Sequence, residues 1–368
     1  MDFIVKKGEL LKELQNVQGV VERKTTVPIL SNLLLETFGN ALRVTATDLD
    51  VTVQCACSAS VKVSGALTLS ARKLFDIVRL LPESDIHFRV DGKNWVHVTC
   101  ERSKFKIASL PKDNFPDIPS AESGTVVLPA QILRHMVSSC IFAITQEESR
   151  YTLNGALMMI HPGSITCVTT DGHRLAFIAR NVDIVGVKSE IRALIPRKTL
   201  VELGKLAPDE LESIEFANTE NHLFFTIGER QLISRVLSGQ FPNYEMVIPK
   251  ENDKRIVLNS LEFSDALKRV AVMADEQSHA VRLSVKEGRL DISSATSDVG
   301  EAKESIPATY KGDEVDIGFN AQYLLDFLAG LSSEEVVLDL RDEDTQGLLS
   351  PTPAESYTHQ YVVMPMRL

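Results

Sequence analysis

The chain has 368 residues, of which 44% are apolar and 24% are charged, and its formal net charge is −11. These values are typical of a globular protein of about two or three domains and exclude a disordered or fibrous chain. The acidic balance argues against a protein that coats nucleic acid with its whole surface, although it allows a basic face on an acidic body.

Neither a signal peptide nor a membrane span is predicted. The first residues are charged where a signal peptide needs an apolar segment, and no run approaches the roughly 20 apolar residues that cross a bilayer. The cysteines are odd in number and lack CxxC spacing, so we expect reduced thiols in a cytoplasmic protein: Cys55, Cys57, Cys100, Cys140 and Cys167. The eight histidines show no pair at metal-ligand spacing. No metal and no other cofactor is predicted.

An amphipathic segment recurs three times along the chain, at residues 8–18, 129–139 and 260–270. In the first copy the apolar residues have the spacing of one helical stripe: Leu10, Leu11, Leu14 and Val17. Each copy therefore predicts a helix that packs one face on a core.

A second helical segment, opened by a small or capping residue, recurs at residues 70–82, 196–206 and 320–328. The aligned positions are 71, 196 and 320, which are 125 and 124 residues apart. A closing strand recurs with similar spacing, at Phe115, Phe241 and Tyr361, which are 126 and 120 residues apart. One period thus fits three landmarks in the same order, and it has the length of a domain.

Short alternating runs between these landmarks predict strands with one buried face, as in residues 42–47, 95–100, 105–109 and 222–227. Each third of the chain is then two helices on a mostly antiparallel sheet, an α+β unit used three times. We predict domains at residues 1–122, 123–250 and 251–368.

The stretch from Cys167 to Phe177 predicts a strand, a tight corner at residues 170–173 and a second strand. Asp171 and His173 are proton-transfer types, so the corner could belong to a hydrolase. The alternative is a hairpin whose polar residues satisfy the turn, and local sequence favours it.

The triplicated unit and the C-terminal segment, residues 362–368, resemble the β sliding clamps of bacterial DNA polymerase III. The matching motifs cover the whole chain: residues 27–35, 46–49, 71–73, 110–111, 115–116, 150–155, 170–175, 196–198, 241–242 and 362–368. The resemblance implies a non-catalytic processivity factor of the cytoplasm, associated with the nucleoid and not with a membrane. Its expected form is a head-to-tail homodimer, a ring of six domains with helices lining the hole. Such a ring binds topologically and needs no sequence-specific contact.

The resemblance also implies partners and DNA-contacting positions. The expected partners are double-stranded and primed DNA, the polymerase III catalytic subunit, the clamp loader, and other polymerases, ligase and mismatch-repair proteins that carry clamp-binding motifs. The DNA-contacting positions correspond to Lys24, Arg72, Glu147, Tyr151 and Thr152. Glu147 stands where the family can have a neutral amide, and Thr152 replaces an aromatic residue.

Basic residues lie on or beside the helical segments and could contact phosphates weakly enough to slide: Lys6, Lys7, Lys12, Arg72, Lys73, Arg79, Arg134, Arg197, Lys198, Lys205, Lys268 and Arg269. The alternative is that these charges only keep exposed helix faces soluble. The last of the six helical segments, residues 320–328, has no basic residue and carries Asp326. A uniformly positive lining of the ring's hole is therefore not expected.

By the same resemblance, a pocket between the second and third domains receives short peptide motifs of client proteins. Its matching positions are Leu153, Thr170, Gly172, His173, Arg174, Leu175, Pro242, Met246, Val247, Val362, Met364, Pro365, Met366 and Arg367. Methionine adapts to varied apolar anchors, and a glycine allows close backbone approach. Met246 stands where the family often has arginine. The alternative is that the Met-Pro-Met terminus is simply a docked final strand.

The dimer joint is expected between the first and third domains, with Phe105 and Ile107 against Val272 and Met273. Charge supports it, because basic residues alternate with these apolar ones and acidic residues cluster in the third repeat: Arg102, Lys104 and Lys106 against Asp298, Glu301 and Glu304.

Other interpretations rest on weaker patterns. Ser70 and Lys73 fit an S-x-x-K acylation motif without its K-T-G companion, so a helix N-cap at Ser70 is preferred. A monomeric peptide-binding scaffold would share the pocket but form no ring. Residues 342–359, rich in Asp, Glu and Pro, are compatible with a mobile loop beside the pocket.

Overall fold

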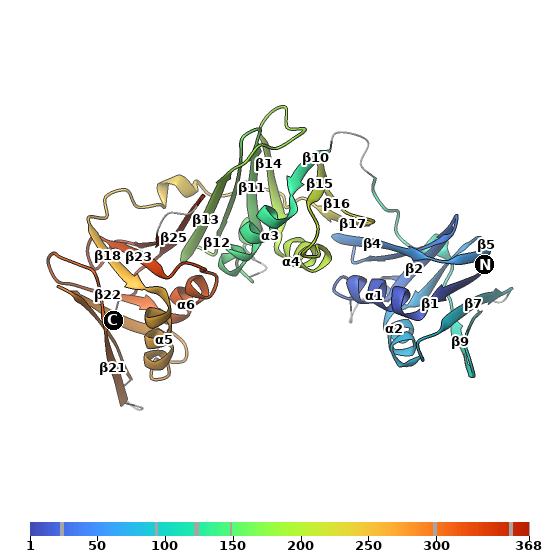
Figure 1. Cartoon of the computed structure of the whole chain (residues 1–368), viewed down its shortest axis with the longest axis horizontal. Helices are drawn as coiled ribbons and strands as arrows, with labels where there is room; N and C mark the ends of the chain where they lie inside the picture. Colours follow the sequence, from blue (N-terminus) through green and yellow to red (C-terminus); the bar gives the residue numbers. More distant parts are fainter. Residues whose placement is uncertain are drawn as a thin grey trace. The chain divides into compact units, whose positions relative to one another are not determined.

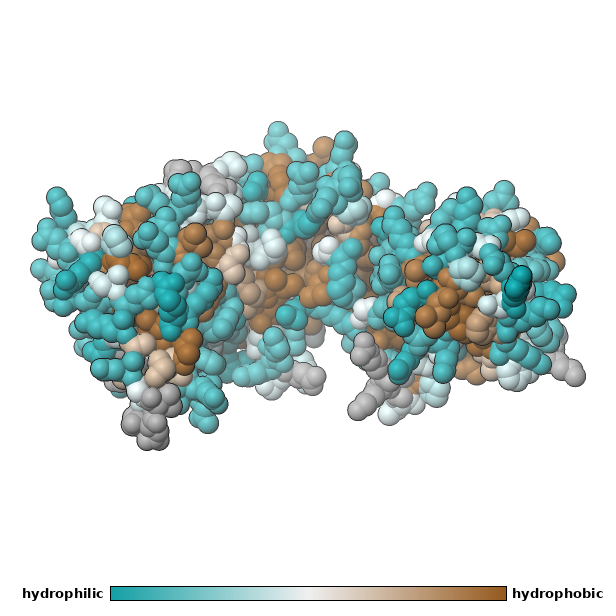
Figure 2. All heavy atoms as spheres, turned by 60° about the horizontal axis from the view of Figure 1, so that its bottom comes forward, coloured by the Kyte–Doolittle hydropathy of each residue, from teal (hydrophilic) through white to brown (hydrophobic). Residues whose placement is uncertain are grey.

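The computed structural model describes residues 1–22, 26–92, 95–120, 125–147, 149–296, 300–352 and 356–367 (Figure 1). It divides into two compact units, one formed by Met1–Gln131 with Lys198–Val236 and the other by Ile132–Arg197 with Leu237–Leu368. Hydrophilic residues cover most of the face drawn in Figure 2, and apolar residues form smaller patches on it. In the described ranges, no helix is both long enough and apolar enough to cross a bilayer.

Six α-helices in the described residues lie where the repeated segments predict them. They are α1 (Lys7–Val17), α2 (Ala71–Leu80), α3 (Ala130–Ser138), α4 (Arg197–Leu206), α5 (Ser260–Ala271) and α6 (Ala321–Ala329). The amphipathic stripe determines which face is buried: Leu10, Leu14 and Val17 of α1 are fully buried.

Side-chain caps fix the starts of the last two helices. Asn320 accepts hydrogen bonds from two backbone N–H groups of α6, and Asn259 does the same for α5, where no cap was predicted. Ser70 occupies the N-cap position of α2, but its hydroxyl makes no capping hydrogen bond. The predicted N-cap is therefore correct in position and wrong in chemistry.

The first unit contains a five-stranded and an eight-stranded antiparallel sheet. The first has the order β5 (Ser60–Val63), β1 (Asp2–Lys6), β7 (Asp85–Asp91), β8 (Trp95–Cys100) and β9 (Ser103–Ala108). The second has the order β10 (Val126–Pro129), β15 (Ser213–Asn218), β16 (His222–Ile227), β17 (Arg230–Arg235), β4 (Val51–Ser58), β3 (Ala41–Thr47), β2 (Asn32–Phe38) and β6 (Ala66–Ser70). Helices α1 and α2 contact each other, and α1 packs on β3 and β4.

The second unit repeats this plan. Its eight-stranded sheet has the order β14 (Ile191–Pro196), β11 (Gly155–His161), β12 (Ser164–Thr170), β13 (Arg174–Asn181), β25 (Tyr357–Val363), β24 (Gly347–Thr352), β23 (Glu335–Leu340) and β18 (Lys254–Asn259). Its four-stranded sheet has the order β21 (Gly300–Pro307), β20 (Arg289–Thr296), β19 (Ala280–Lys286) and β22 (Val315–Asn320). Helices α5 and α6 contact each other, and α5 packs on β20 and β21.

Each eight-stranded sheet joins strands of two successive repeats. In the first unit β4 pairs with β17, and in the second unit β13 pairs with β25 in the corresponding place. The second pairing also corrects an expectation, because residues 342–359 are not simply a loop: they include β24 and the start of β25. These backbone hydrogen bonds fuse each repeat to the next.

Candidate functional site

The corner between β12 and β13 is a tight turn held by two side chains. Asp171 Oδ1 accepts the N–H groups of His173 at 2.9 Å and of Arg174 at 3.0 Å. Thr170 Oγ1 accepts the Gly172 N–H at 3.1 Å and donates to the Arg174 carbonyl at 2.6 Å. Gly172 has φ of 92°, a backbone conformation that is unfavourable for residues other than glycine. The polar residues of this corner satisfy the turn, as the hairpin interpretation requires.

Arg174 fixes the corner to the elements behind it. Its Nε donates to Asp171 Oδ2 at 2.9 Å and its Nη1 donates to Asp326 Oδ2 at 2.6 Å, while Nη2 reaches the Phe142 carbonyl at 2.7 Å. The guanidinium also lies 4.3 Å from the centre of the Tyr323 ring. Burial opposes the charge, but Tyr361, Asp326 and Asp171 together outweigh it and raise the pKa of Arg174. Because its donors are used inside the chain, Arg174 positions the corner.

An apolar cluster lies beside this corner on strands β11 to β14 and β25 of the same sheet. Its buried members are Leu157, Met159, Val168, Leu175, Leu194 and Val362. Partly buried side chains pack against it: Phe177, Leu237, Phe241, Tyr244, Val247, Ile248 and Leu348. Only Leu175, Val247 and Val362 of these belong to the predicted pocket. For Leu157, Met159 and Val168 the sequence signal was the apolar content of β11 and β12, which marks buried strands but not what each face contacts.

A short 3-10 helix, Tyr244–Met246, covers one side of the cluster. The Tyr244 hydroxyl lies 3.9 Å from Met159 Sδ, and its ring lies 5.9 Å from the Phe177 ring. Met246 is 81% exposed and lines a cavity of about 420 Å³ together with Ile248 and Arg341. This segment, called the linker below, thus supplies the packed aromatic ring of Tyr244 and the exposed, flexible thioether of Met246.

The C-terminal segment leaves the cluster after Met364. The Met364 N–H donates to the His173 carbonyl at 2.9 Å, and the side chain is 42% exposed at the corner. Two residues later, the Met366 N–H donates to the Gly318 carbonyl of β22 at 2.8 Å. The predicted set is therefore divided, because Met366 and Arg367 lie against β22 and not against the apolar cluster.

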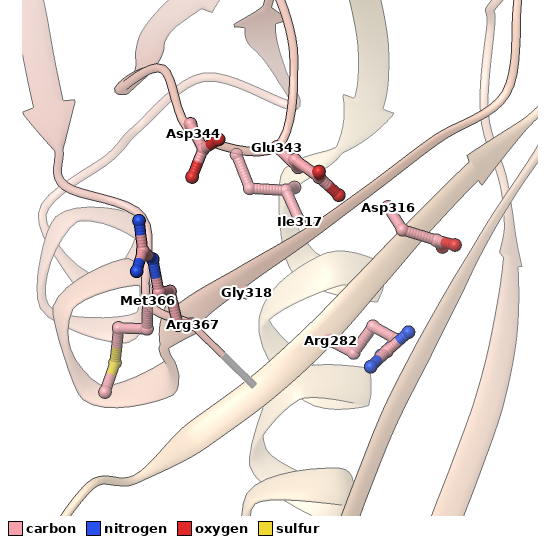
Figure 3. Close-up of a pocket in the computed structure, with 8 residues that line it drawn as sticks. All are labelled: Arg282, Asp316, Ile317, Gly318, Glu343, Asp344, Met366 and Arg367. Carbon is pink, nitrogen blue, oxygen red and sulfur yellow. The ribbon is translucent and has the colours of Figure 1, made fainter.

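Met366 and Arg367 line a cavity of about 430 Å³ (Figure 3). Glu343 and Asp344 come from the loop above it, and Arg282 and Asp316 come from β19 and β22. A second cavity, of about 710 Å³, shares Arg282, Met366 and Arg367 with the first. The remaining predicted positions lie near the corner: Leu153 is half-buried in the 3-10 helix Tyr151–Leu153, and Pro365 is half-buried.

The predicted DNA-contacting positions differ in how free their charges are. Lys24 lies outside the described residues. The side chain of Arg72 is 91% exposed and its Nε lies 3.9 Å from Asp76. Glu147 pairs with Arg150 at 3.0 Å, and Arg150 also donates to the Asp171 carbonyl at 2.8 Å. Tyr151 is 72% exposed, whereas Thr152 is half-buried.

Several basic residues of the helical segments are paired with carboxylates of the same unit. The pairs are Lys7–Glu83, Arg72–Asp76, Arg79–Asp76, Lys198–Asp48, Lys205–Glu202, Lys268–Asp265 and Arg269–Glu304. Lys6, Lys12 and Lys73 are exposed and make no ion pair within the described part of the chain. Among the basic residues named above, these three lysines are therefore unpaired in the described part of the first unit; Lys6 ends β1, and Lys12 and Lys73 lie on α1 and α2.

The predicted dimer residues lie at or near open edges. Phe105 is 37% exposed on β9, the edge strand of its sheet, and Ile107 is half-buried on the same strand. Val272 is 77% exposed after α5, next to the half-buried Met273. Strand β21, which carries Glu301, is the edge of the other sheet.

Glu304, which was predicted as a charge of the dimer joint, is already paired within its own unit. Both oxygens of Glu304 accept hydrogen bonds from Arg269, at 2.5 and 2.9 Å, and these bonds lower the pKa of Glu304. Glu304 is therefore not the free partner that the sequence suggested. Glu301 is exposed, and Asp298 lies outside the described residues.

The geometry gives little support to a hydrolase at the corner. Both oxygens of Asp171 are engaged by the turn and by Arg174. Across the described ranges, no group of three or more His, Cys, Asp or Glu residues is placed to hold a metal. All five cysteines are free and buried, and burial raises the pKa of Cys57 to about 12.

Comparison with known proteins matches three family models of the DNA polymerase III beta subunit in succession. The N-terminal domain model matches residues 1–119, the central domain model 127–243 and the C-terminal domain model 245–367. The chain belongs to the DNA polymerase III beta subunit family. It is thus a sliding clamp, a processivity factor and not an enzyme.

Relatives and solved structures agree along the full length. The Beta sliding clamp of Pseudomonas putida is 36% identical over 371 residues, with 100% of both chains covered. The sliding clamp of Pseudomonas aeruginosa bound to griselimycin has a TM-score of 0.94 at 34% identity, and that of Bartonella birtlesii bound to griselimycin has 0.95 at 35%; in both, 100% of each chain is covered. The three α+β repeats of this clamp are therefore the fold of its family.

Proposed function

We propose that this sliding clamp closes as a head-to-tail homodimer around double-stranded and primed DNA. Its domains would then be residues 1–122, 123–250 and 251–368. The support is that β9 and β21 are both open edge strands, with exposed apolar side chains at Phe105 and Val272 close to them. Antiparallel pairing of the two edges would bury these side chains and join the five-stranded sheet of one subunit to the four-stranded sheet of the next.

Inside such a ring, the DNA is held by weak and exchangeable contacts. We assign these to Lys24, Arg72, Glu147, Tyr151 and Thr152 and to the free lysines Lys6, Lys12 and Lys73. Apart from Arg72, whose side chain is 91% exposed, the paired cations contribute less, because a carboxylate already neutralises each of them. The clamp works in the cytoplasm, at the nucleoid.

The proposed peptide-binding site combines the apolar cluster, the corner and the linker with the C-terminal residues that follow Val363. Its proposed residues are Leu153, Thr170, Gly172, His173, Arg174, Leu175, Pro242, Met246, Val247, Val362, Met364, Pro365, Met366 and Arg367. The observation that carries this assignment is the combination of a buried apolar floor with two exposed methionines, Met246 and Met364, at its rim. An extended peptide can bury an aliphatic or aromatic side chain there while the methionines adapt to its shape.

The clients would be the polymerase III catalytic subunit, the clamp loader, and other polymerases, ligase and mismatch-repair proteins. A fluorescent peptide with the clamp-binding motif of the cognate catalytic subunit tests this by polarisation. Met364→Glu should weaken binding at least about tenfold, because it places a charge at an apolar contact. Val185→Glu, at an apolar side chain 71% exposed elsewhere in the same unit, should leave the affinity unchanged. Equal affinities for the two variants would refute the site.

A further inference from the structure

The corner between β3 and β4 reproduces the corner between β12 and β13. Asp48 Oδ1 accepts the N–H groups of Asp50 at 3.0 Å and of Val51 at 2.6 Å, as Asp171 does for the residues two and three positions after it. Thr47 Oγ1 accepts the Leu49 N–H at 3.1 Å, which matches the bond that Thr170 accepts. The two turns therefore have one construction.

The neighbouring strands of the two corners, β17 beside β4 and β25 beside β13, are also paired in the same register. The Arg235 N–H donates to the Asp50 carbonyl at 2.8 Å, and the Met364 N–H donates to the His173 carbonyl at 2.9 Å. Ile233 is paired with Thr52, as Val362 is paired with Leu175. Arg235 thus takes the place of Met364, and Ile233 the place of Val362.

A cavity of about 190 Å³ lies at this first corner, within the first unit. It is lined by Leu49, Asp50, Thr52, Ile233 and Arg235. Pro116, which belongs to the segment that links the first repeat to the second, lines it as well. Pro116 follows Phe115 as Pro242 follows Phe241, and Phe115 packs against Leu34 of β2 and against Ile29 and Leu30 of the preceding 3-10 helix. The first corner therefore has the same parts as the proposed peptide site: a turn, a strand of the next repeat and a linker.

A second cavity of about 530 Å³ is lined by the same linker. It shares Pro116, Asp117 and Pro119 with the first cavity, so the two cavities adjoin along the linker. An extended peptide could follow the linker and contact both cavities.

The chemistry of the first corner differs from that of the second. Leu49 stands where the second corner has Gly172, and it keeps the same left-handed conformation, with φ of 82°, although it is not glycine. Such strain persists where the surroundings fix the residue. Leu49 lines the cavity and is 48% exposed. Leu49 offers an aliphatic contact that a glycine does not.

The charges around the two cavities favour a basic ligand. Glu36 pairs with Lys112 at 2.6 Å, and Asp50 lies 3.8 Å from Arg235. Asp117 and Asp113 are exposed on the linker side and make no ion pair with any described residue. Arg43 of the second cavity makes no ion pair with a described residue either, so the unpaired carboxylates outnumber the unpaired cation by one, and a cationic ligand is favoured.

We propose that the junction of the first and second repeats is a second docking site. It binds a short extended segment of a partner protein that carries lysine or arginine beside an aliphatic residue. The aliphatic side chain packs on Leu49, and the basic side chains lie against Asp117 and Asp113. This second docking site rests on the proposed function, because it shares the construction of the proposed peptide site at the second corner.

The test uses the full chain with labelled Leu, Ile, Val and Met methyl groups, followed by NMR. Griselimycin, which is bound in the related clamps, is added first to fill the site at the second corner. The probe is then acetyl-Lys-Leu-Lys-amide, with acetyl-Glu-Leu-Glu-amide as its charge-reversed control. Binding at the first corner should shift the methyl signals of Leu49 and Ile233 in a saturable way with the basic probe only.

Asp117→Asn should raise the dissociation constant of the basic probe about two- to fivefold, because it removes one partly screened charge pair. Asp183→Asn makes the same change in charge at an exposed site of the other unit and should leave the constant unaltered. No shift at millimolar probe, or equal shifts with both probes, would overturn the second site. Failure of griselimycin to move the Leu175 and Val362 signals would count against the first-proposed site, so the two failures can be told apart.

Discussion

A single guanidinium, that of Arg174, holds the corner beside the apolar cluster. It bridges Asp171 of the turn and Asp326 of α6, whose side chains are 14% and 24% exposed. Removing the guanidinium leaves two carboxylates close together and largely out of water, and this state is costly. The corner is therefore an ion-pair network rather than a loop that takes shape on binding.

Arg174→Ala should lower the free energy of unfolding by about 3 kcal/mol, since it leaves both carboxylates without their partner. Arg174→Lys should cost less, because a lysine keeps the charge but cannot bridge both carboxylates with a planar fork. Arg192→Ala removes an exposed arginine 3.7 Å from Glu190 and should cost under about 1 kcal/mol. Urea unfolding measures all three. A cost for Arg174→Ala no larger than that for Arg192→Ala would show that the network contributes nothing.

His359 gives the second unit a dependence on pH. Its side chain is 4% exposed among Phe327 and Tyr357, and burial lowers its pKa from 6.5 to about 4. Between these two values the unfolded chain binds the proton and the folded chain does not, so stability falls as the pH falls. This loss is complete near pH 4 and absent above about pH 7.

His359→Phe removes the titrating group and keeps a ring in the same place. The wild-type chain should lose stability between pH 7 and pH 5 by about 2 kcal/mol more than His359→Phe does. His161→Gln, at a half-exposed histidine, should behave like the wild-type chain. Urea unfolding at the two pH values provides the comparison, and parallel losses in wild type and His359→Phe would rule out this origin.

At the scale of the elements, the sequence predicted the helices well and the sheets only in part. Local periodicity decides where a helix forms and which face it buries, so the ranges of α1 to α6 follow from the pattern alone. Strand partners are chosen by packing across long sequence separations, and nothing in residues 51–58 indicates that they pair with residues 230–235. The fusion of successive repeats into one sheet was therefore not predictable.

The site was predicted from a resemblance, and its chemistry was only partly visible in the sequence. The turn residues Thr170, Asp171 and Gly172 have local preferences that reveal the corner. The ion pairs of Arg174 and Glu304 depend on residues far away in the chain, so the sequence could not show that both groups were already used. The same reason explains why the sequence could not show that Met366 lies against β22.

A buried ion pair joins α1 of the first repeat to β17 of the second. Arg230 donates to the two oxygens of Glu13 at 2.8 and 3.0 Å. Burial acts to raise the pKa of Glu13, but hydrogen bonds from Arg230 and Asn16 outweigh it and lower the pKa. This pair connects two successive repeats within one compact unit.

Glu13→Gln should cost about 3 kcal/mol, because it leaves the Arg230 charge without its counter-ion. Adding Arg230→Met to Glu13→Gln should recover part of this loss, since the unpaired buried charge is then gone. Asp265→Asn, which breaks the exposed pair with Lys268, should cost under about 1 kcal/mol. Strictly additive effects of Glu13→Gln and Arg230→Met in thermal unfolding would show that the two groups do not act as a pair.

At the scale of the whole molecule, the account requires that two chains close through β9 and β21. Replacing Lys104 and Lys106 by glutamate reverses the charge of one edge opposite Glu301, and the dimer should shift toward the monomer. Replacing Glu215 and Glu220, which are exposed away from both edges, by lysine should leave the dimer intact. Sedimentation velocity compares the variants at equal concentration, and an unchanged mass for the Lys104 and Lys106 variant would remove the charge argument for this joint.

The most direct measurement of the central claim is retention on DNA of defined topology. The chain is incubated with a clamp loader, ATP and a primed circular DNA, the complex is isolated at moderate salt, and the circle is then cut once. The account predicts that the protein stays on the circle and is lost from the linear DNA, because a closed ring slides off an end. Binding that is weakened by salt and unaffected by the cut would mean ordinary electrostatic association, and the proposed ring would have to be abandoned.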